Sequence, residues 1–304
     1  MPSVSSLEEA SGLLASAHAE GKSFRIGNDL TTAGLDRILE HETGDLTCTV
    51  EAGVRLSALN AVLGASSQRL SLDPPGDPTI GALLAENLSG PLRHRFGAPR
   101  DLVLGVTLVL ADGTVASAGG KVVKNVAGYD LARLVCGSRG RLALIARASF
   151  RLHPLPKAAR TLVVEADDAG TVVAKLLRSQ LQPSALDVLH PGRVAVLFEG
   201  SHRAVDAQLA AASALVGGAE TGSEVWEESR TRQVAALGRV CFAPGDLSHV
   251  LADVTEAVVR PASGVAYTRD PRPDTLSQGD SADAVQRLVE AIRRQLDPHG
   301  VLAA

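Results

Sequence analysis

The sequence predicts an α+β protein made of two domains. A chain of 304 residues is long enough to build two hydrophobic cores. A hairpin turn at Ala111-Asp112-Gly113 and a β-α-β-β-α-β pattern in the second half indicate antiparallel sheets with helices. The segment His153-Pro154-Leu155-Pro156 ends a strand, because two prolines so close together interrupt strand pairing. We therefore expect one domain over residues 1–156 and a smaller one over residues 157–304.

In the first domain, residues 5–20 are expected to form a helix. Ser5 or Ser6 can cap it, and Glu8 and Glu9 fall in its first turn. The remaining elements are expected as strands at 23–26, 46–51, 102–110, 114–117 and 142–152, helices at 56–63 and 130–136, and a loop with a short helix at 72–91.

The second domain shows a β-α-β-β-α-β pattern, which is the ferredoxin-like arrangement of an antiparallel sheet. Its members are expected at residues 161–165, 171–180, 185–189, 194–198 and 204–215, with a last short strand near Ala219. Further elements are expected as a strand at 239–242, a helix at 247–258, a strand at 264–268, an exposed loop at 269–282 and an amphipathic helix at 282–296. The last helix is expected to return to the first domain.

Composition and charge exclude several classes of protein. The 45% hydrophobic and 21% charged residues are typical of a soluble globular chain. No apolar run reaches the roughly 18–20 residues of a membrane span, and no signal sequence precedes the first helix. We expect a cytoplasmic protein, associated with a membrane only through partners. The net charge of −4 and the lack of a basic tail argue against nucleic acid.

Charge within the first domain is uneven. Residues 121–151 carry seven basic side chains and the single acid Asp130. This excess suits an anionic ligand such as a dinucleotide, although a solvated basic face would have the same composition. The three cysteines, Cys48, Cys136 and Cys241, form no C-x-x-C pair, and no histidine cluster has metal-ligand spacing. We expect no metal site, and three thiolates are too few for an iron–sulfur cluster.

Three glycine-bearing segments carry the candidate chemistry. The first is Pro74-Pro75-Gly76-Asp77-Pro78-Thr79-Ile80-Gly81-Ala82, followed by Asn87-Leu88-Ser89-Gly90; its glycines allow close backbone approach and its short polar side chains can bond phosphate or a ring edge. The second runs from Gly119 to Leu131. The third is Gly137-Ser138-Arg139-Gly140-Arg141-Leu142-Ala143-Leu144-Ile145. None has the G-x-G-x-x-G of a Rossmann fold.

In their order and spacing, these segments resemble the FAD domain of the vanillyl-alcohol-oxidase (p-cresol methylhydroxylase) superfamily. That family shows T-I-G-G-x-x-A-x-N-x-x-G, then R-D-x-V-L-G, then G-S-x-G-x-L-G-I-I, and the middle piece is Arg100-Asp101-Leu102-Val103-Leu104-Gly105 here. The strings Lys124-Asn125-Val126-Ala127-Gly128-Tyr129-Asp130-Leu131 and Gln295-Leu296-Asp297-Pro298-His299-Gly300-Val301 are similar to the FAD-binding subunits of glycolate oxidases. The resemblance is dense over residues 5–156 and weak beyond.

The resemblance implies a two-lobed domain with FAD bound in a cleft between the lobes. The bond is expected to be non-covalent, because no histidine lies in residues 24–34. The residues that match the family's cofactor contacts are Gly27, Asn28, Pro75, Thr79, Ile80, Gly81, Asn87, Ser89, Gly90, Asp130, Gly137 and Ile145. The family also implies a homologous catalytic flavoprotein subunit, an iron–sulfur subunit and a 2-hydroxy acid as the substrate.

The sequence departs from the family pattern at three positions. Asp29 places a carboxylate in a loop that is glycine-rich in the family, and Ala82 and Ala143 each stand where the family has glycine. No catalytic residue is assigned: His190, His202, Arg193 and Tyr267 have no spacing that separates them from surface or core residues. The favoured function is an FAD-binding subunit of a glycolate-oxidising complex. The alternatives are a self-sufficient 2-hydroxy-acid dehydrogenase, a structural subunit that has lost FAD, and an NADPH-dependent reductase, against which the Lys124–Leu131 string argues.

Overall fold

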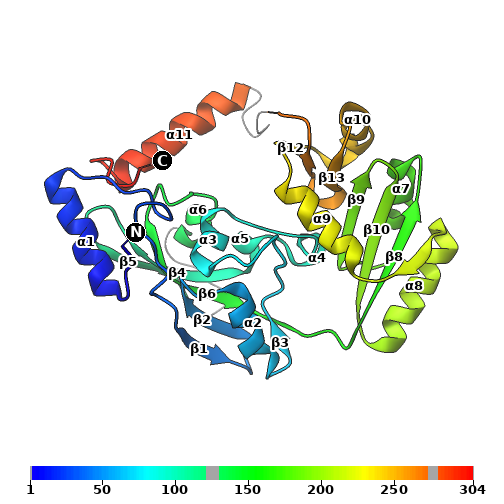
Figure 1. Ribbon diagram of the computed structural model, residues 1–304, viewed down its shortest axis with the longest axis horizontal. Coiled ribbons are helices and arrows are strands. Elements are labelled where there is room, and N and C mark those ends of the chain that lie inside the picture. Colours follow the sequence, from blue (N-terminus) through cyan, green and yellow to red (C-terminus); the bar gives the residue numbers. More distant parts are fainter. Residues whose placement is uncertain (1, 121–129, 273–279, 304) are drawn as a thin grey trace.

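The computed structural model describes residues 2–120, 130–272 and 280–303. Two large antiparallel sheets dominate it, one from each half of the chain, and helices pack on both (Figure 1). The α+β class predicted from the sequence is confirmed. In Figure 1 the sheet of the N-terminal half lies on the left, the second sheet lies on the right, and the last helix lies at the upper left above the first sheet.

The first sheet has five strands in the order β1-β2-β6-β4-β5. Its strands are Ile38–Glu42 (β1), Thr47–Glu51 (β2), Val103–Val109 (β4), Val115–Gly119 (β5) and Leu144–Arg151 (β6). The β4–β5 hairpin turns at the predicted Asp112-Gly113: the Asp112 carboxylate accepts the Thr114 N–H at 2.8 Å, and Gly113 takes a φ of +85°.

Helices accompany this sheet in the N-terminal half, beside a separate two-stranded ribbon. They are Leu7–Glu20 (α1), Leu56–Gly64 (α2), Ile80–Ala85 (α3), Arg93–Phe96 (α4), Pro99–Leu102 (α5) and Leu131–Val135 (α6), with the ribbon formed by Gln68–Arg69 (β3) and His153–Pro154 (β7). The predicted first helix is confirmed: the Ser6 hydroxyl accepts the Glu9 N–H at 3.1 Å, and Gly21 ends the helix at a φ of +66°.

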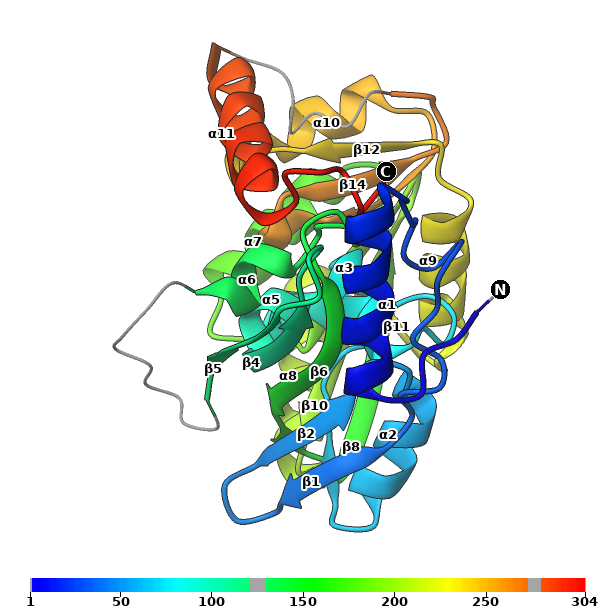
Figure 2. The same cartoon turned by 90° about the vertical axis from the view of Figure 1, so that its left-hand side faces the viewer.

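The C-terminal segment returns to the N-terminal half, as Figure 2 also shows. Helix α11 (Asp280–Leu296) leads into Val301 and Leu302, which are buried in one cluster with Leu14 of α1. The Phe24 N–H donates to the Val301 carbonyl at 2.7 Å, and the Asp297 carboxylate accepts the N–H groups of residues 301 and 302 at 2.8 Å. This tail is therefore part of the core beneath α1.

The second sheet has seven strands in the order β11-β8-β10-β9-β13-β14-β12. The first four come from a β-α-β-β-α-β unit and lie in the ferredoxin-like order. This unit consists of Ala158–Glu165 (β8), Ala169–Arg178 (α7), Ala185–His190 (β9), Arg193–Gly200 (β10), His202–Val216 (α8) and Ala219–Thr221 (β11). The remaining elements are Glu224–Val234 (α9), Gly238–Cys241 (β12), Pro244–Asp246 (η1), Leu247–Asp253 (α10), Ala257–Arg260 (β13), Pro261–Ser263 (η2) and Val265–Thr268 (β14).

The two faces of the second sheet are covered differently. One face packs against α7, α8 and α10 through a large apolar cluster. The other face carries Ala185, Leu189 and Ala195, which pack on Val225 and Trp226 of α9. Helix α9 and the strands beneath it border the N-terminal half (Figure 1).

Several predicted elements are wrong. Residues 23–26 form no strand but two isolated bridges, Phe24 to Leu302 and Ile26 to Leu30, because their main partner is the distant C-terminal tail. The helix predicted over 247–258 ends at Asp253, since Val254 is extended and the apolar run Ala257-Val258-Val259 joins the sheet as β13. Helix α9 and strand β1 were not predicted. Within the described segments, no helix has the length and apolar character that crossing a bilayer requires.

Candidate functional site

The first glycine segment folds around the short helix α3. Thr79 caps this helix by accepting the Ala82 N–H at 3.3 Å. The Gly81 N–H donates to the Ala52 carbonyl at 2.7 Å, and a β-carbon on Gly81 would lie 3.1 Å from the Ala52 Cβ. Gly81 therefore lets α3 pack on the end of β2. Ile80 is buried in the core beside it, and Pro75 is half-buried in the preceding loop.

Gly90 permits an even closer approach between two parts of the protein. A β-carbon there would lie 1.8 Å from the Asp73 carbonyl oxygen. The packing of protein atoms alone therefore requires glycine at positions 81 and 90. Gly27 and Gly76, in contrast, lie at positive φ in loops where a β-carbon would meet no atom within 4 Å.

The third glycine segment packs against the end of α3. The N–H groups of Gly137 and Arg139 donate to the carbonyls of Leu84 and Ala85 at 3.0 and 2.9 Å. A β-carbon on Gly137 would lie 3.8 Å from the Cβ of Asn87, a residue with a φ of +50°. The Asn87 side chain accepts the Arg100 N–H at 3.3 Å. The structure therefore joins two segments that are 50 residues apart in the sequence.

The loop around Gly27 contacts the same third segment. A β-carbon on Gly140 would lie 2.8 Å from the Ile26 Cβ, which places the loop directly against it. Gly27 has a φ of +93°, and Asn28 lies exposed beside it. The Asp29 carboxylate accepts hydrogen bonds from the Arg25 guanidinium at 3.0 and 3.1 Å, and these bonds lower the pKa of Asp29. The Asp29 carboxylate, which the family pattern lacks, is therefore paired with the Arg25 guanidinium.

Asp130 and Ile145 complete the predicted set. Asp130 caps α6, accepting the Arg133 N–H at 3.1 Å, and its side chain is exposed. Ile145 is 4% exposed in the core next to Ala146, whose carbonyl accepts the Ala52 N–H at 2.9 Å. Most of the second glycine segment, residues 121–129, lies outside the described residues, and so does the larger part of the Lys124–Leu131 string.

Ser89 lies where the N-terminal half meets the second sheet. Its hydroxyl accepts from Arg93 at 3.1 Å, and its carbonyl accepts from Gln233 of α9 at 3.0 Å. The Arg260 guanidinium reaches the same carbonyl at 3.5 Å. We call this boundary between the two halves the seam; no sequence signal marked Gln233 or Arg260 as part of it.

Asp73 and a second ion pair also hold the seam together. The Asp73 carboxylate accepts the Leu92 N–H at 2.9 Å and lies 3.4 Å from Arg230 of α9. Burial raises the pKa of the Asp73 carboxyl to about 7, against the lowering effects of the Leu92 N–H and the two arginines Arg230 and Arg260. A cavity of about 500 Å³ opens here between the loop Asp73–Gly76 and α9. Farther along, Arg69 and Glu199 form a bidentate pair at 2.6 and 2.8 Å.

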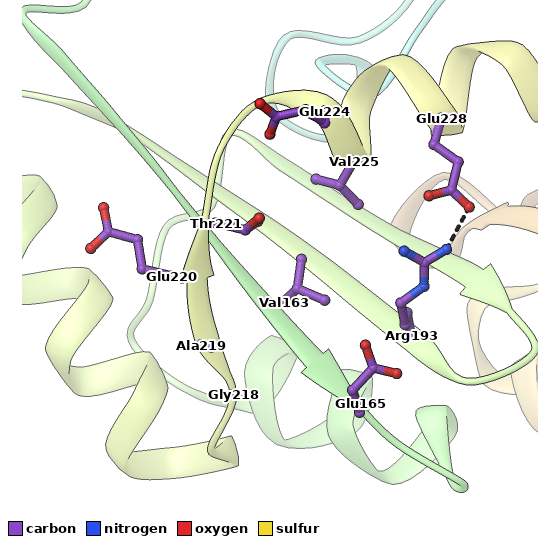
Figure 3. A pocket seen from close by; sticks show the side chains of 10 residues that line it. All are labelled: Val163, Glu165, Arg193, Gly218, Ala219, Glu220, Thr221, Glu224, Val225 and Glu228. Atoms are coloured by element: carbon purple, nitrogen blue, oxygen red, sulfur yellow. Dashed lines mark hydrogen bonds and ion pairs between the residues drawn. The ribbon is translucent and has the colours of Figure 1, made fainter.

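The residues considered for catalysis do not meet. Arg193 lines a cavity of about 590 Å³ on the second sheet, where Figure 3 shows it pointing at Glu228, 2.5 Å away. Glu165, Glu220 and Glu224 line the same cavity, so it repels a carboxylate substrate. His190 ends β9 and His202 begins α8, on separate elements. Among the described residues, no three metal-ligating side chains cluster.

Known proteins resemble this chain in sequence and in fold. Residues 16–119 match the FAD binding domain family. Glycolate oxidase subunit GlcE of Escherichia coli (strain K12) is 31% identical over 226 residues, 71% of this chain and 63% of that protein. Glycolate oxidase subunit GlcD of Bacillus subtilis (strain 168) is 35% identical over 164 residues, 51% of this chain and 34% of the relative. The chain thus spans less than two thirds of these curated relatives.

The solved structure of an alkyldihydroxyacetonephosphate synthase shares the fold, with a TM-score of 0.74 at 15% sequence identity. The superposition covers 99% of this chain and 74% of the synthase chain. Fold and glycine segments together define the class of FAD-binding flavoproteins with a mixed helix and antiparallel-sheet architecture. The N-terminal half of the chain therefore contains an FAD-binding domain of the vanillyl-alcohol-oxidase (p-cresol methylhydroxylase) type.

Proposed function

We propose that the chain is the FAD-binding subunit of a complex that oxidises a 2-hydroxy acid such as glycolate. The observation that carries this proposal is the convergence of the Gly27 loop, helix α3 with Asn87, and the Gly137 segment, in a chain that is 31% identical to a glycolate oxidase subunit. The domain boundary at residue 156 is part of the same proposal.

The converging residues fit the cofactor chemically. The Gly27 loop presents an open position at positive φ, and Thr79, Asn87 and Ser89 supply short polar side chains along one segment. The pairing of Asp29 with Arg25 offsets the negative charge that would otherwise repel a diphosphate. We propose Gly27, Asn28, Pro75, Thr79, Ile80, Gly81, Asn87, Ser89, Gly90, Asp130, Gly137 and Ile145 as the residues that hold or shape the site.

FAD would supply the two-electron acceptor for the oxidation. This chain would orient it and exclude water from it at the seam, where Ser89 is bonded by both halves. The described residues offer no metal-ligand cluster for onward electron transfer. We therefore propose a homologous catalytic flavoprotein and an iron–sulfur subunit as partners, in the cytoplasm or at a membrane reached through them.

Gly27 offers a sharp test of the cofactor site. Gly27→Val should strongly reduce the flavin content, because a branched side chain would occupy the open position in the loop. Gly192→Val is the matched control: Gly192 has a φ of +97° and open space, but it lies in the β9–β10 turn, far along the chain from the glycine segments. Equal flavin content in both variants would contradict the placement.

The activity is tested by glycolate-dependent dye reduction. We expect little turnover by the chain alone and clear turnover after co-expression with the two partners. Substantial turnover by the lone chain would favour the self-sufficient dehydrogenase. A native protein without flavin would favour the structural subunit, and dye reduction driven by NADPH would favour the reductase.

A further inference from the structure

One face of the second sheet directs a group of polar side chains toward the seam. Arg239 of β12 is paired with Tyr267 of β14, so both side chains project from the same face. Val258 of β13 is the other partner of Tyr267, and Arg260, two residues on, shares that face. The Arg260 guanidinium lies over the Tyr267 ring, 5.1 Å from its centroid.

The N-terminal half contributes a third arginine to this group. Helix α4 packs against β9 and against η2, the turn that follows Arg260. Arg93 begins α4, and burial lowers the pKa of its guanidinium, with further lowering by Arg239 and Arg260 and opposing effects of Tyr267 and Asp101. We call Arg93, Arg239, Arg260 and Tyr267 the arginine cluster.

Only one of the three cations is neutralised within the part of the chain that the structure describes. Arg260, 1% exposed, lies 3.6 Å from the buried Asp187 carboxylate and donates to Gln233 at 2.7 Å. Neither Arg93 nor Arg239 has a described carboxylate within 4.0 Å. Arg93 donates to the Ser89 hydroxyl at 3.1 Å, and the Arg239 Nε is buried without a hydrogen-bond partner.

Uncompensated guanidinium groups that are half-buried side by side repel each other, so this arrangement costs free energy unless an anion joins it. A carboxylate is the anion whose two oxygens match the fork of a guanidinium. Arg260 already contacts Asp187 and Gln233, so its guanidinium holds the cluster in place rather than binding a ligand. Arg93 and Arg239 are half-buried, and among the described residues neither is paired with a carboxylate.

The cluster also adjoins the proposed flavin segment. Ser89 receives hydrogen bonds from Arg93 on its hydroxyl and from Arg260 on its carbonyl. A small anion held by the arginines would therefore lie next to the Asn87–Gly90 stretch, where a substrate must lie to react with a flavin bound there.

From this geometry we propose that Arg93 and Arg239, with Tyr267, bind the carboxylate of a small 2-hydroxy acid at the seam. The choice of 2-hydroxy acid rests on the proposed function; the choice of a small carboxylate rests on the cluster. Arg260 positions the cluster by fixing the Tyr267 ring and does not itself bind the ligand.

The test is calorimetric titration of the purified full chain with oxalate, a small dicarboxylate that no flavin oxidation consumes. Arg93→Met and Arg239→Met should each weaken oxalate binding by about tenfold to a hundredfold, the effect of losing a charge-assisted bond. Arg178→Met is the matched control, because Arg178 lies exposed at the end of α7, and it should leave the affinity unchanged. Arg239→Lys keeps the charge but loses the fork and should give an intermediate affinity.

Flavin content, measured on every variant, separates this proposal from the proposed function. Arginine-dependent oxalate binding by a protein without flavin would support the site and contradict the cofactor. Flavin-bearing wild-type protein that binds no oxalate, or variants with unchanged affinity, would overturn the site. Inorganic phosphate bound as tightly as oxalate would overturn its assignment to carboxylates.

Discussion

The α-carbon of Gly90 packs so tightly against Asp73 that a β-carbon would lie 1.8 Å from the Asp73 carbonyl oxygen and 2.5 Å from its Oδ1. The same carboxylate accepts the Leu92 N–H and lies 3.4 Å from Arg230 of α9. The loop from residue 73 to residue 92 is therefore closed on itself and tied to the second sheet. A change in this contact alters both the proposed flavin segment and the seam.

Gly90→Ala should destabilise the protein by more than about 3 kcal/mol, because the clash is with backbone that cannot move aside cheaply. Gly76→Ala is the control: it lies in the same loop, with open space at its β-carbon position and a φ of +71°. Its cost should be about 1 kcal/mol, from the left-handed backbone alone. Urea unfolding of both variants gives the comparison, and equal losses would contradict the packing account.

Asp73 should make the stability of the seam depend on pH. Its folded-state pKa of about 7 lies above the ordinary value of 3.8, so the folded protein binds more protons than the unfolded chain between these values. The stabilising contribution is thus complete below pH 3.8 and is lost as the pH rises through 7, with a slope of at most about 1.4 kcal/mol per pH unit.

The comparison is between wild type and Asp73→Asn, whose amide oxygen can still accept the Leu92 N–H but does not titrate. Unfolding free energies measured from pH 5 to pH 8 should fall for the wild type relative to the variant. Parallel curves would show that Asp73 does not titrate in this range.

Arg69→Met should cost about 2 to 4 kcal/mol, because it leaves Glu199, 9% exposed, buried without a partner across the seam. The exposed pair Arg160–Glu220 is the control, and Arg160→Met should cost less than about 1 kcal/mol. A double-mutant cycle with Glu199→Gln isolates the pair. A coupling energy near zero would refute a stabilising role for this pair.

Local signals in the sequence sufficed for much of the fold. Ser6 and Gly21 mark the ends of α1, Asp112-Gly113 marks a hairpin, and the β-α-β-β-α-β pattern gives the order of four strands in the second sheet. Helix α9 escaped prediction because its sequence, EVWEESRTRQV, buries little besides Val225 and Trp226 and shows no apolar period.

The glycine motifs predicted where the candidate site lies, but they did not predict which packing contacts require each glycine. That Gly90 faces Asp73 depends on a turn that no motif describes. The arginine cluster could not be predicted at all, because the Arg260 guanidinium and the Ser89 carbonyl are 171 residues apart and meet only through the packing of two sheets. Arg193, by contrast, was a candidate from the sequence, but in the structure its guanidinium forms an ion pair with Glu228.

We expect this chain to bind FAD without a covalent bond. The visible spectrum of the purified native protein, followed by acid precipitation and quantification of the released flavin, measures this directly. A yellow protein should release about one FAD per chain into the supernatant. A colourless native protein, or flavin that stays with the precipitated protein, would contradict it.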